Sequence, residues 1–148
     1  MILSRASGYA LFAVAYLSSK PPGEFHPVHE IARLAGVPWR MMSRTCHTLA
    51  RAGILRAVKG ISRGVALARP ASEIRPYDVV RLFERPRRRQ SAPSRRPAAT
   101  PYADAVRDHV REAQRRMMDA MKEFTFQDLL VKKPAVQGAK RKASGASA

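Results

Sequence analysis

The fold is decided by residues 28–67, VHEIARLAGVPWRMMSRTCHTLARAGILRAVKGISRGVAL. Apolar residues recur three or four positions apart over residues 28–35 and again over residues 38–52, which predicts two short amphipathic helices. Gly36 permits a tight turn between them, and Pro38 suits the first position of the second helix, where its missing N–H costs nothing. Two helices joined by so short a turn have the spacing of a helix-turn-helix.

The second of these helices has two distinct faces. Its buried stripe is predicted to contain Met42, Cys46 and Leu49, which follow one another at i, i+4 and i+7. The opposite face carries side chains that can bind base edges or phosphates in a DNA major groove, namely Arg40, Ser43, Arg44 and His47. An ordinary solvated helix face has a similar composition, so this feature needs support from its neighbours in the chain.

A predicted β-hairpin follows directly. Residues 54–58 and 65–67 are expected to form two short strands, joined by a basic turn that contains glycines. Lys59 and Arg63, near its tip, are positioned to reach a minor groove or the phosphate backbone. A hairpin placed immediately after a recognition helix is the wing of a winged helix-turn-helix, so the sequence predicts a mainly α fold with one small β-hairpin.

Helices are also predicted before and after this motif. Ser4 is the expected N-cap of a first helix that ends near residue 19, and Pro76 opens a fourth helix. Inward positions on the first, second and fourth helices are expected at Ala10, Leu11, Ala13, Val14, Leu17, Ile31, Leu34, Ala35, Val79, Val80 and Phe83. Residues 1–84 are therefore interpreted as one DNA-binding domain. At its start, Ser4 and Arg5 are candidate phosphate contacts.

The remaining chain divides into three parts. Residues 85–100 are rich in Pro, Arg and Ser and are expected to be a flexible linker, and residues 132–148 a disordered basic tail. Between them, residues 101–131 predict a helix of about 23 residues and a short last helix, opened by a capping box at residues 125–128, with Leu129 and Leu130 inward.

The long helix carries one continuous apolar seam. Its members are Tyr102, Val106, Val110, Ala113, Met117, Met121 and Phe124. A seam of this length exceeds what so small a domain can cover, so a second copy of the chain is the expected partner and the helix is interpreted as a dimerisation helix. Packing against the first helix of the same chain is the alternative.

Composition favours a nucleic-acid partner. The 148 residues include 28 Lys and Arg against 11 Asp and Glu, a formal net charge of +17. Such an excess attracts polyanions, DNA or RNA first and an anionic membrane second, although an arginine-rich background composition produces the same imbalance. The N-terminal apolar stretch lacks the features of a secretion signal, and no segment reaches the roughly 20 apolar residues that span a bilayer, so the cytoplasm is the expected location.

Several short segments resemble the winged-helix regulator family typified by the iron–sulfur cluster regulator and by the nitric-oxide-sensing and cysteine-metabolism repressors. They are LS (3–4), YAL (9–11), Val28, IA (31–32), GVP (36–38), Leu49 with AGI (52–54), LARPASEI (67–74), DVV (78–80) and TFQDL (125–129). The order and spacing carry the resemblance, which covers residues 1 to about 131. It implies a dimer with crossed long helices that represses or activates promoters.

The sequence departs from this family at its cofactor site. Many members hold an iron–sulfur cluster through three cysteines between the fourth helix and the long helix. Residues 85–100 contain no Cys or His, and Arg107, near the position of a histidine ligand in some relatives, cannot coordinate iron. We therefore expect no cofactor. Ser43 stands where relatives place an acidic base-reading residue and Arg63 replaces a wing glycine, so their target sequence does not transfer.

Two residues and three function classes stay open. The single cysteine, Cys46, is either a redox switch beside Arg44 and His47 or, as favoured here, a small core residue. Trp39 is expected to pack in the turn rather than stack on a sugar. No catalytic motif and no metal-ligand spacing among the histidines is evident, so an enzyme is not expected. The main prediction is a sequence-specific homodimeric regulator. The two alternatives are a sequence-indifferent nucleic-acid binder that uses the linker and tail, and an adaptor that docks a metabolic enzyme.

Overall fold

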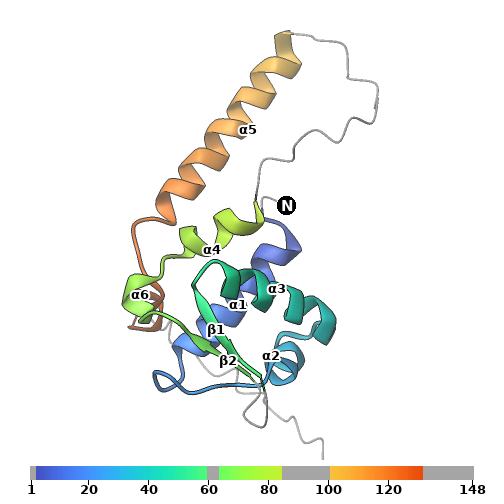
Figure 1. Ribbon diagram of the computed structural model, residues 1–148. Helices are drawn as coiled ribbons and strands as arrows, with labels where there is room; N and C mark the ends of the chain where they lie inside the picture. Colours follow the sequence, from blue (N-terminus) through green and yellow to red (C-terminus); the bar gives the residue numbers. More distant parts are fainter. Residues whose placement is uncertain (1–2, 60–63, 85–100, 132–148) are drawn as a thin grey trace, which may run out of the picture.

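The computed structural model describes residues 3–59, 64–84 and 101–131 (Figure 1). Its elements, in chain order, are α1 (Arg5–Ser18), α2 (Val28–Ala35), α3 (Trp39–Arg51), β1 (Leu55–Val58), β2 (Gly64–Leu67), the 3-10 helix η1 (Ala71–Glu73), α4 (Pro76–Phe83), α5 (Pro101–Ala120) and α6 (Phe126–Val131). The predicted class, mainly helical with one antiparallel hairpin, is confirmed. The predicted linker, the predicted tail and Arg63 lie outside the described residues.

Helix α1 lies at the centre of the core and contacts α2, α3, α4, α6 and β2. Its stripe of Ala10, Ala13, Val14 and Leu17 is buried, as the periodicity predicted. Around it pack apolar side chains from every other part of the fold except the projecting length of α5, including Ile31, Met42, Leu49, Leu55, Ile74, Val79 and Phe126. Phe126 shows that α6 belongs to this core.

Two inward assignments are wrong. Leu34 is 47% exposed and Leu129 is 43% exposed. In α2 the buried pair is Ile31 and Ala32, and Leu34 lies about 110° around the helix from the middle of that pair at 3.6 residues per turn. In α6 the buried residue is Phe126, at the first position of the helix, and Leu129 stays exposed one turn later.

The hairpin is fixed near the loop end of its strands by a close backbone contact. Strands β1 and β2 are antiparallel, with Leu55 opposite Leu67 and Val58 opposite Gly64. The N–H of His26 donates to the carbonyl of Val65 and the N–H of Val65 donates to the carbonyl of His26, both at 2.9 Å. A Cβ on Gly64 would lie 2.6 Å from the His26 carbonyl oxygen. Glycine is therefore required at this position because two backbones meet there.

The start of α1 is tied to the end of α4. Ser4 is the N-cap, and its Oγ accepts the N–H of Ser7 at 3.2 Å. The Glu84 Oε1 atom accepts both the N–H of Ser4 and the Oγ–H of fully buried Ser7, each at 2.6 Å. Partial desolvation opposes ionisation, but the hydrogen bonds from Ser7 and Ser4 outweigh it and lower the pKa of Glu84. A carboxylate at the positive end of a helix is also favoured by its dipole.

The segment after α5 returns to the body of the molecule. Figure 1 shows α5 projecting away from the other helices, with α6 turned back against them. The N–H of Tyr77 donates to the carbonyl of Met121 at 3.3 Å, and the N–H of Phe126 donates to the carbonyl of Ile74 at 2.9 Å. The expected capping box is present, since Thr125 Oγ1 accepts the N–H of Asp128 at 3.3 Å and Asp128 Oδ2 accepts the N–H of Thr125 at 2.7 Å. Helix α5 has 20 residues rather than about 23 because the chain turns after Ala120.

Gly64→Ala should lower the free energy of unfolding by about 1–3 kcal/mol, because the new methyl group must displace the His26 backbone. Urea unfolding followed by circular dichroism measures the change. Gly8→Ala is the matched control, since a Cβ there meets nothing within 4 Å and alanine is favoured over glycine in a helix by roughly 0.5–1 kcal/mol. Equal effects at the two glycines would contradict the close contact.

Glu84→Gln should reduce stability at pH 7 by less than about 1 kcal/mol, because the carboxyl group is partly open to solvent. The pKa of Glu84 is lowered in the folded protein, so its contribution is present above the unfolded pKa and disappears as the pH falls through the folded pKa. Urea midpoints of the two proteins should therefore differ at pH 7 and converge in acid. A difference that is constant with pH would show that ionised Glu84 is not the source.

Candidate nucleic-acid interface

The turn between α2 and α3 sets the angle at which α3 leaves α2. Gly36 has a positive φ of 67°, the left-handed conformation that an L side chain rarely adopts. The N–H of Val37 donates to the carbonyl of Ala32 at 3.0 Å, which closes the end of α2. Pro38 is extended and is the residue before the helix rather than its first residue, so α3 begins at Trp39. The predicted helix, glycine turn and helix are thus in place.

Burial of one stripe fixes the rotation of α3. Met42 and Leu49 are completely buried and Cys46 is 3% exposed, so the predicted stripe is confirmed. Thr45 is buried beside them, and its hydroxyl is satisfied because Oγ1 donates to the carbonyl of Met41 at 3.0 Å. With this stripe inward, the polar side of α3 must face away from the core.

The predicted DNA-contacting side chains share this outer face. Arg40, Arg44 and His47 are exposed and Ser43 is half-buried. Ser43, Arg44 and His47 line an open hollow of about 530 Å³ together with Thr48. Helix α3 contains no Asp or Glu. The structure therefore places these four side chains on one outward face of a helix that contains no acidic residue.

Arg51 also lies on this face, although it was not predicted from the sequence, and Trp39 does not lie where it was predicted. Arg51 is exposed and follows His47 by four residues, so extension of the same helical spacing by one turn would have found it. Trp39 is 59% exposed and Met41 is 44% exposed, so the expectation that Trp39 packs in the turn is wrong. As the first residue of α3, Trp39 precedes the buried stripe. An apolar pair at this end of a recognition helix can contact sugars or thymine methyl groups.

The hairpin and the start of α1 carry the other predicted contacts. Lys59 is exposed and follows β1 directly, whereas Arg63 lies outside the described residues. The Ser4 Oγ and N–H are already used by Ser7 and Glu84, as described above. Arg5 is exposed at the first position of α1. A phosphate contact by Ser4 or Arg5 stays a prediction, and Arg5 is the better candidate because its side chain faces solvent.

Cys46 lies in the core. Burial raises the pKa of its thiol to about 11, so at neutral pH the group is protonated and poorly nucleophilic. This environment agrees with the core interpretation of Cys46 and offers no support for the redox interpretation.

The chemistry of the available ligands does not fit an iron–sulfur cluster. The whole sequence contains one cysteine, and a cluster held by thiolates requires several. Within residues 3–59, 64–84 and 101–131, no three His, Cys, Asp or Glu side chains are grouped closely enough to hold a metal ion. The residues of this chain therefore do not fit such a cluster.

The apolar seam of α5 is uncovered over most of its length. Tyr102 is 84% exposed, Val106 is 63% exposed and Val110 is 52% exposed. Nearer the body, Met117, Met121 and Phe124 are half-buried. The predicted alternative, intrachain packing of the whole seam against α1, is therefore not what this single chain shows.

Ion pairs follow the other sides of α5. Asp104 pairs with Arg107, Asp108 with Arg111 at 3.2 Å, Glu112 with Arg115 and Arg116 at 2.8 Å, and Asp119 with Arg115 at 3.0 Å and Lys122 at 2.9 Å. Hydrogen bonds from Arg115 and Arg116 lower the pKa of Glu112 to about 2. The helix thus separates a charged, internally paired side from an apolar seam. No helix within the described part of the chain is long and apolar enough to cross a membrane.

Comparison with known proteins places the chain in a family. The model of the Rrf2 family, described as an iron-dependent transcriptional regulator, matches residues 3–132. Similar solved structures include CymR of Staphylococcus aureus (25% identity, 85% of this chain and 95% of that chain, TM-score 0.64). CymR of B. subtilis (20% identity, 89% and 98%, TM-score 0.62) and T. potens IscR (20% identity, 93% and 92%, TM-score 0.65) share the fold. The chain belongs to the Rrf2 family of winged-helix transcriptional regulators.

Proposed function

We propose that the protein is a sequence-specific, DNA-binding repressor that acts as a homodimer in the cytoplasm without an iron–sulfur cluster. The outward face of α3 carries the proposal, because it presents Arg40, Arg44, His47 and Arg51 to solvent on a helix that contains no Asp or Glu. Guanidinium groups on such a helix bind guanine edges and phosphates in a major groove. A dimer seated on a promoter represses it by excluding other proteins.

The hairpin supports the same interface. It follows α3 directly, and buried Leu55 and Val65 attach its two strands to the core. Lys59 and, by prediction, Arg63 bind the minor groove or the adjacent backbone, while Ser43 and His47 complete the contacts of α3. With Ser43 in place of an acidic residue, the operator differs from those of relatives that read a base through a carboxylate.

The uncovered seam of α5 supports the homodimer. Tyr102, Val106 and Val110 form a row of exposed apolar side chains on a helix that projects from the body (Figure 1). A second copy offers the same row, so antiparallel or crossed packing of two such helices buries both seams. Two-fold symmetry then places two recognition helices about one helical turn apart on DNA, roughly 34 Å.

Arg44→Ala should weaken binding to an operator selected from a random-sequence library by about 1–3 kcal/mol, or roughly 5- to 150-fold, if Arg44 reads a base. Gel-shift titrations at fixed salt measure the loss. Arg81→Ala on α4 removes the same charge from an exposed position and should have a small effect. An equal loss for Arg44→Ala on random DNA would contradict a base-reading role.

Footprinting separates a specific regulator from the sequence-indifferent alternative. Two protected half-sites about one turn apart are expected for the dimer. Uniform protection that depends only on DNA length and salt would instead support a general nucleic-acid binder that uses the basic linker and tail.

Replacing Val106 and Val110 together by Asp should convert the dimer to a monomer, because two carboxylates cannot be buried in an apolar seam without a large desolvation penalty. Light scattering coupled to size exclusion gives the mass, and circular dichroism confirms that the helix is retained. Val58→Asp is the control, since Val58 is 41% exposed on the hairpin. An unchanged mass for the double variant would place the dimer contact elsewhere.

A further inference from the structure

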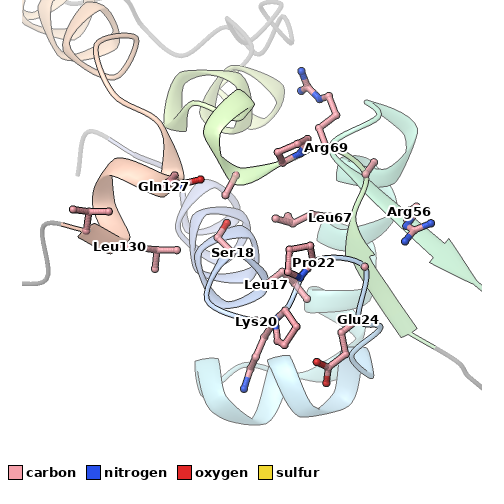
Figure 2. Close-up of a pocket in the computed structure, with 16 residues that line it drawn as sticks. Leu17, Ser18, Lys20, Pro22, Glu24, Arg56, Leu67, Arg69, Gln127 and Leu130 are labelled. Carbon is pink, nitrogen blue, oxygen red and sulfur yellow. The ribbon is translucent and has the colours of Figure 1, made fainter.

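A cavity of about 750 Å³ lies on a part of the molecule that the DNA-binding proposal does not use (Figure 2). It is enclosed by the end of α1, the loop that follows it, the base of the hairpin and α6. Helix α3 contributes none of its lining. The volume falls within the range of roughly 300–1,000 Å³ that small-molecule sites occupy.

The walls of this cavity are apolar. Leu17, Leu67 and Leu130 come from three separate elements, and prolines from two connecting segments complete the surface. In the view of Figure 2, Leu17, Leu67 and Pro22 lie in the middle of the lining, with Arg69 above them, Arg56 to the right, and Lys20 and Glu24 below. Such a surface suits a ligand with a hydrocarbon or aromatic body.

The charged rim is unbalanced. Lys20, Arg56 and Arg69 line the cavity, against a single carboxylate, Glu24. Glu24 is directed towards His26, with 3.5 Å between Oε1 and Nε2. None of the ion pairs within the described part of the chain joins it to one of the three rim cations. The rim therefore favours a ligand with a negative charge.

Two of the cations lie over aromatic rings. The Lys20 Nζ atom lies 4.9 Å from the centre of the Tyr16 ring, and the Arg56 guanidinium carbon lies 4.9 Å from the centre of the Phe25 ring. Neither contact neutralises the positive charge, so both groups keep their attraction for an anion.

We propose that this cavity binds a small organic anion with an apolar body, such as a medium-chain or aryl-substituted carboxylate. The tail of the chain is a poor competitor for the site. It follows Val131, which lines the cavity, but residues 132–148 carry five Lys or Arg and no Asp or Glu, so the cationic rim repels them. A bound ligand contacts α1, β2 and α6, and α6 is the helix that follows the projecting helix α5 in the chain.

The test uses the full chain and isothermal titration with two probes, octanoate and 4-phenylbutyrate. Each should saturate one site per chain, and 4-phenylbutyramide, the neutral analogue, should bind at least tenfold more weakly. Lys20→Gln with Arg69→Gln should weaken both carboxylates at least tenfold, and Leu130→Trp should block them by filling the cavity. Arg33→Gln with Arg81→Gln removes the same charge from exposed positions outside the lining and should leave the affinity unchanged.

Amide chemical shifts locate the site independently of affinity. On addition of 4-phenylbutyrate, the largest changes are expected around Leu17, Leu67 and Leu130 rather than along α3. The proposal is overturned if neither carboxylate saturates, if the amide binds as tightly, or if the control double variant loses as much affinity as the rim variant, which would indicate general binding of anions to a basic protein. No step measures DNA binding, so the result is separate from the operator test.

Discussion

The orientation of α3 depends on burial of a single stripe, and most of the functional geometry follows from it. Met42, Cys46 and Leu49 occupy the core beside α1, and burial of a large apolar side chain is worth about 1.5–3 kcal/mol. Any rotation of α3 large enough to bury Arg44 would expose this stripe and place a guanidinium in the core, which costs far more than it returns. The core therefore determines which side chains can meet a duplex. Gly36 then fixes the turn that precedes α3, and the His26–Val65 pairing fixes the hairpin that follows it.

Family membership and the means of regulation separate in this protein. The chain matches the Rrf2 family over residues 3–132, and the family description names iron, yet its sequence contains a single cysteine, which lies in the core. A fold carries a function only through the groups placed on it. Winged-helix architecture is retained because it depends on apolar periodicity and on two glycines. An iron–sulfur cluster depends on several thiolate ligands, which a sequence with one cysteine does not supply.

Much of the fold could be predicted from local sequence, and the predictions that were wrong have physical causes. Helix α2, the hairpin and the capping box of α6 were predicted because glycine, proline and cap residues mark them within a few positions. Leu34 and Leu129 were misplaced because helices as short as α2 and α6 offer too few residues to define an inward side, and their neighbours decide the rotation. Trp39 was misplaced because it is the first residue of α3 and precedes the buried stripe. The contact between Ser4 and Glu84 spans 80 residues, and the cavity beneath α6 is formed by segments far apart in the chain. Such features arise from packing, which periodicity does not encode. The outer face of α3 was predictable because this helix of 13 residues buries one apolar side chain in each of three successive turns, Met42, Cys46 and Leu49.

The paired charges along α5 bear on how two chains assemble. Every acidic side chain of this helix has a cationic partner three or four residues away, a spacing that stabilises a helix from within. The arm is thus held in shape by its own side chains before any neighbour arrives. In the proposed homodimer, association would then dock two preformed helices, which spares the entropy that segments lose when they fold upon contact. Assembly of the proposed homodimer would then depend on ionic strength through each arm, because salt screens the exposed ion pairs that stabilise the helix.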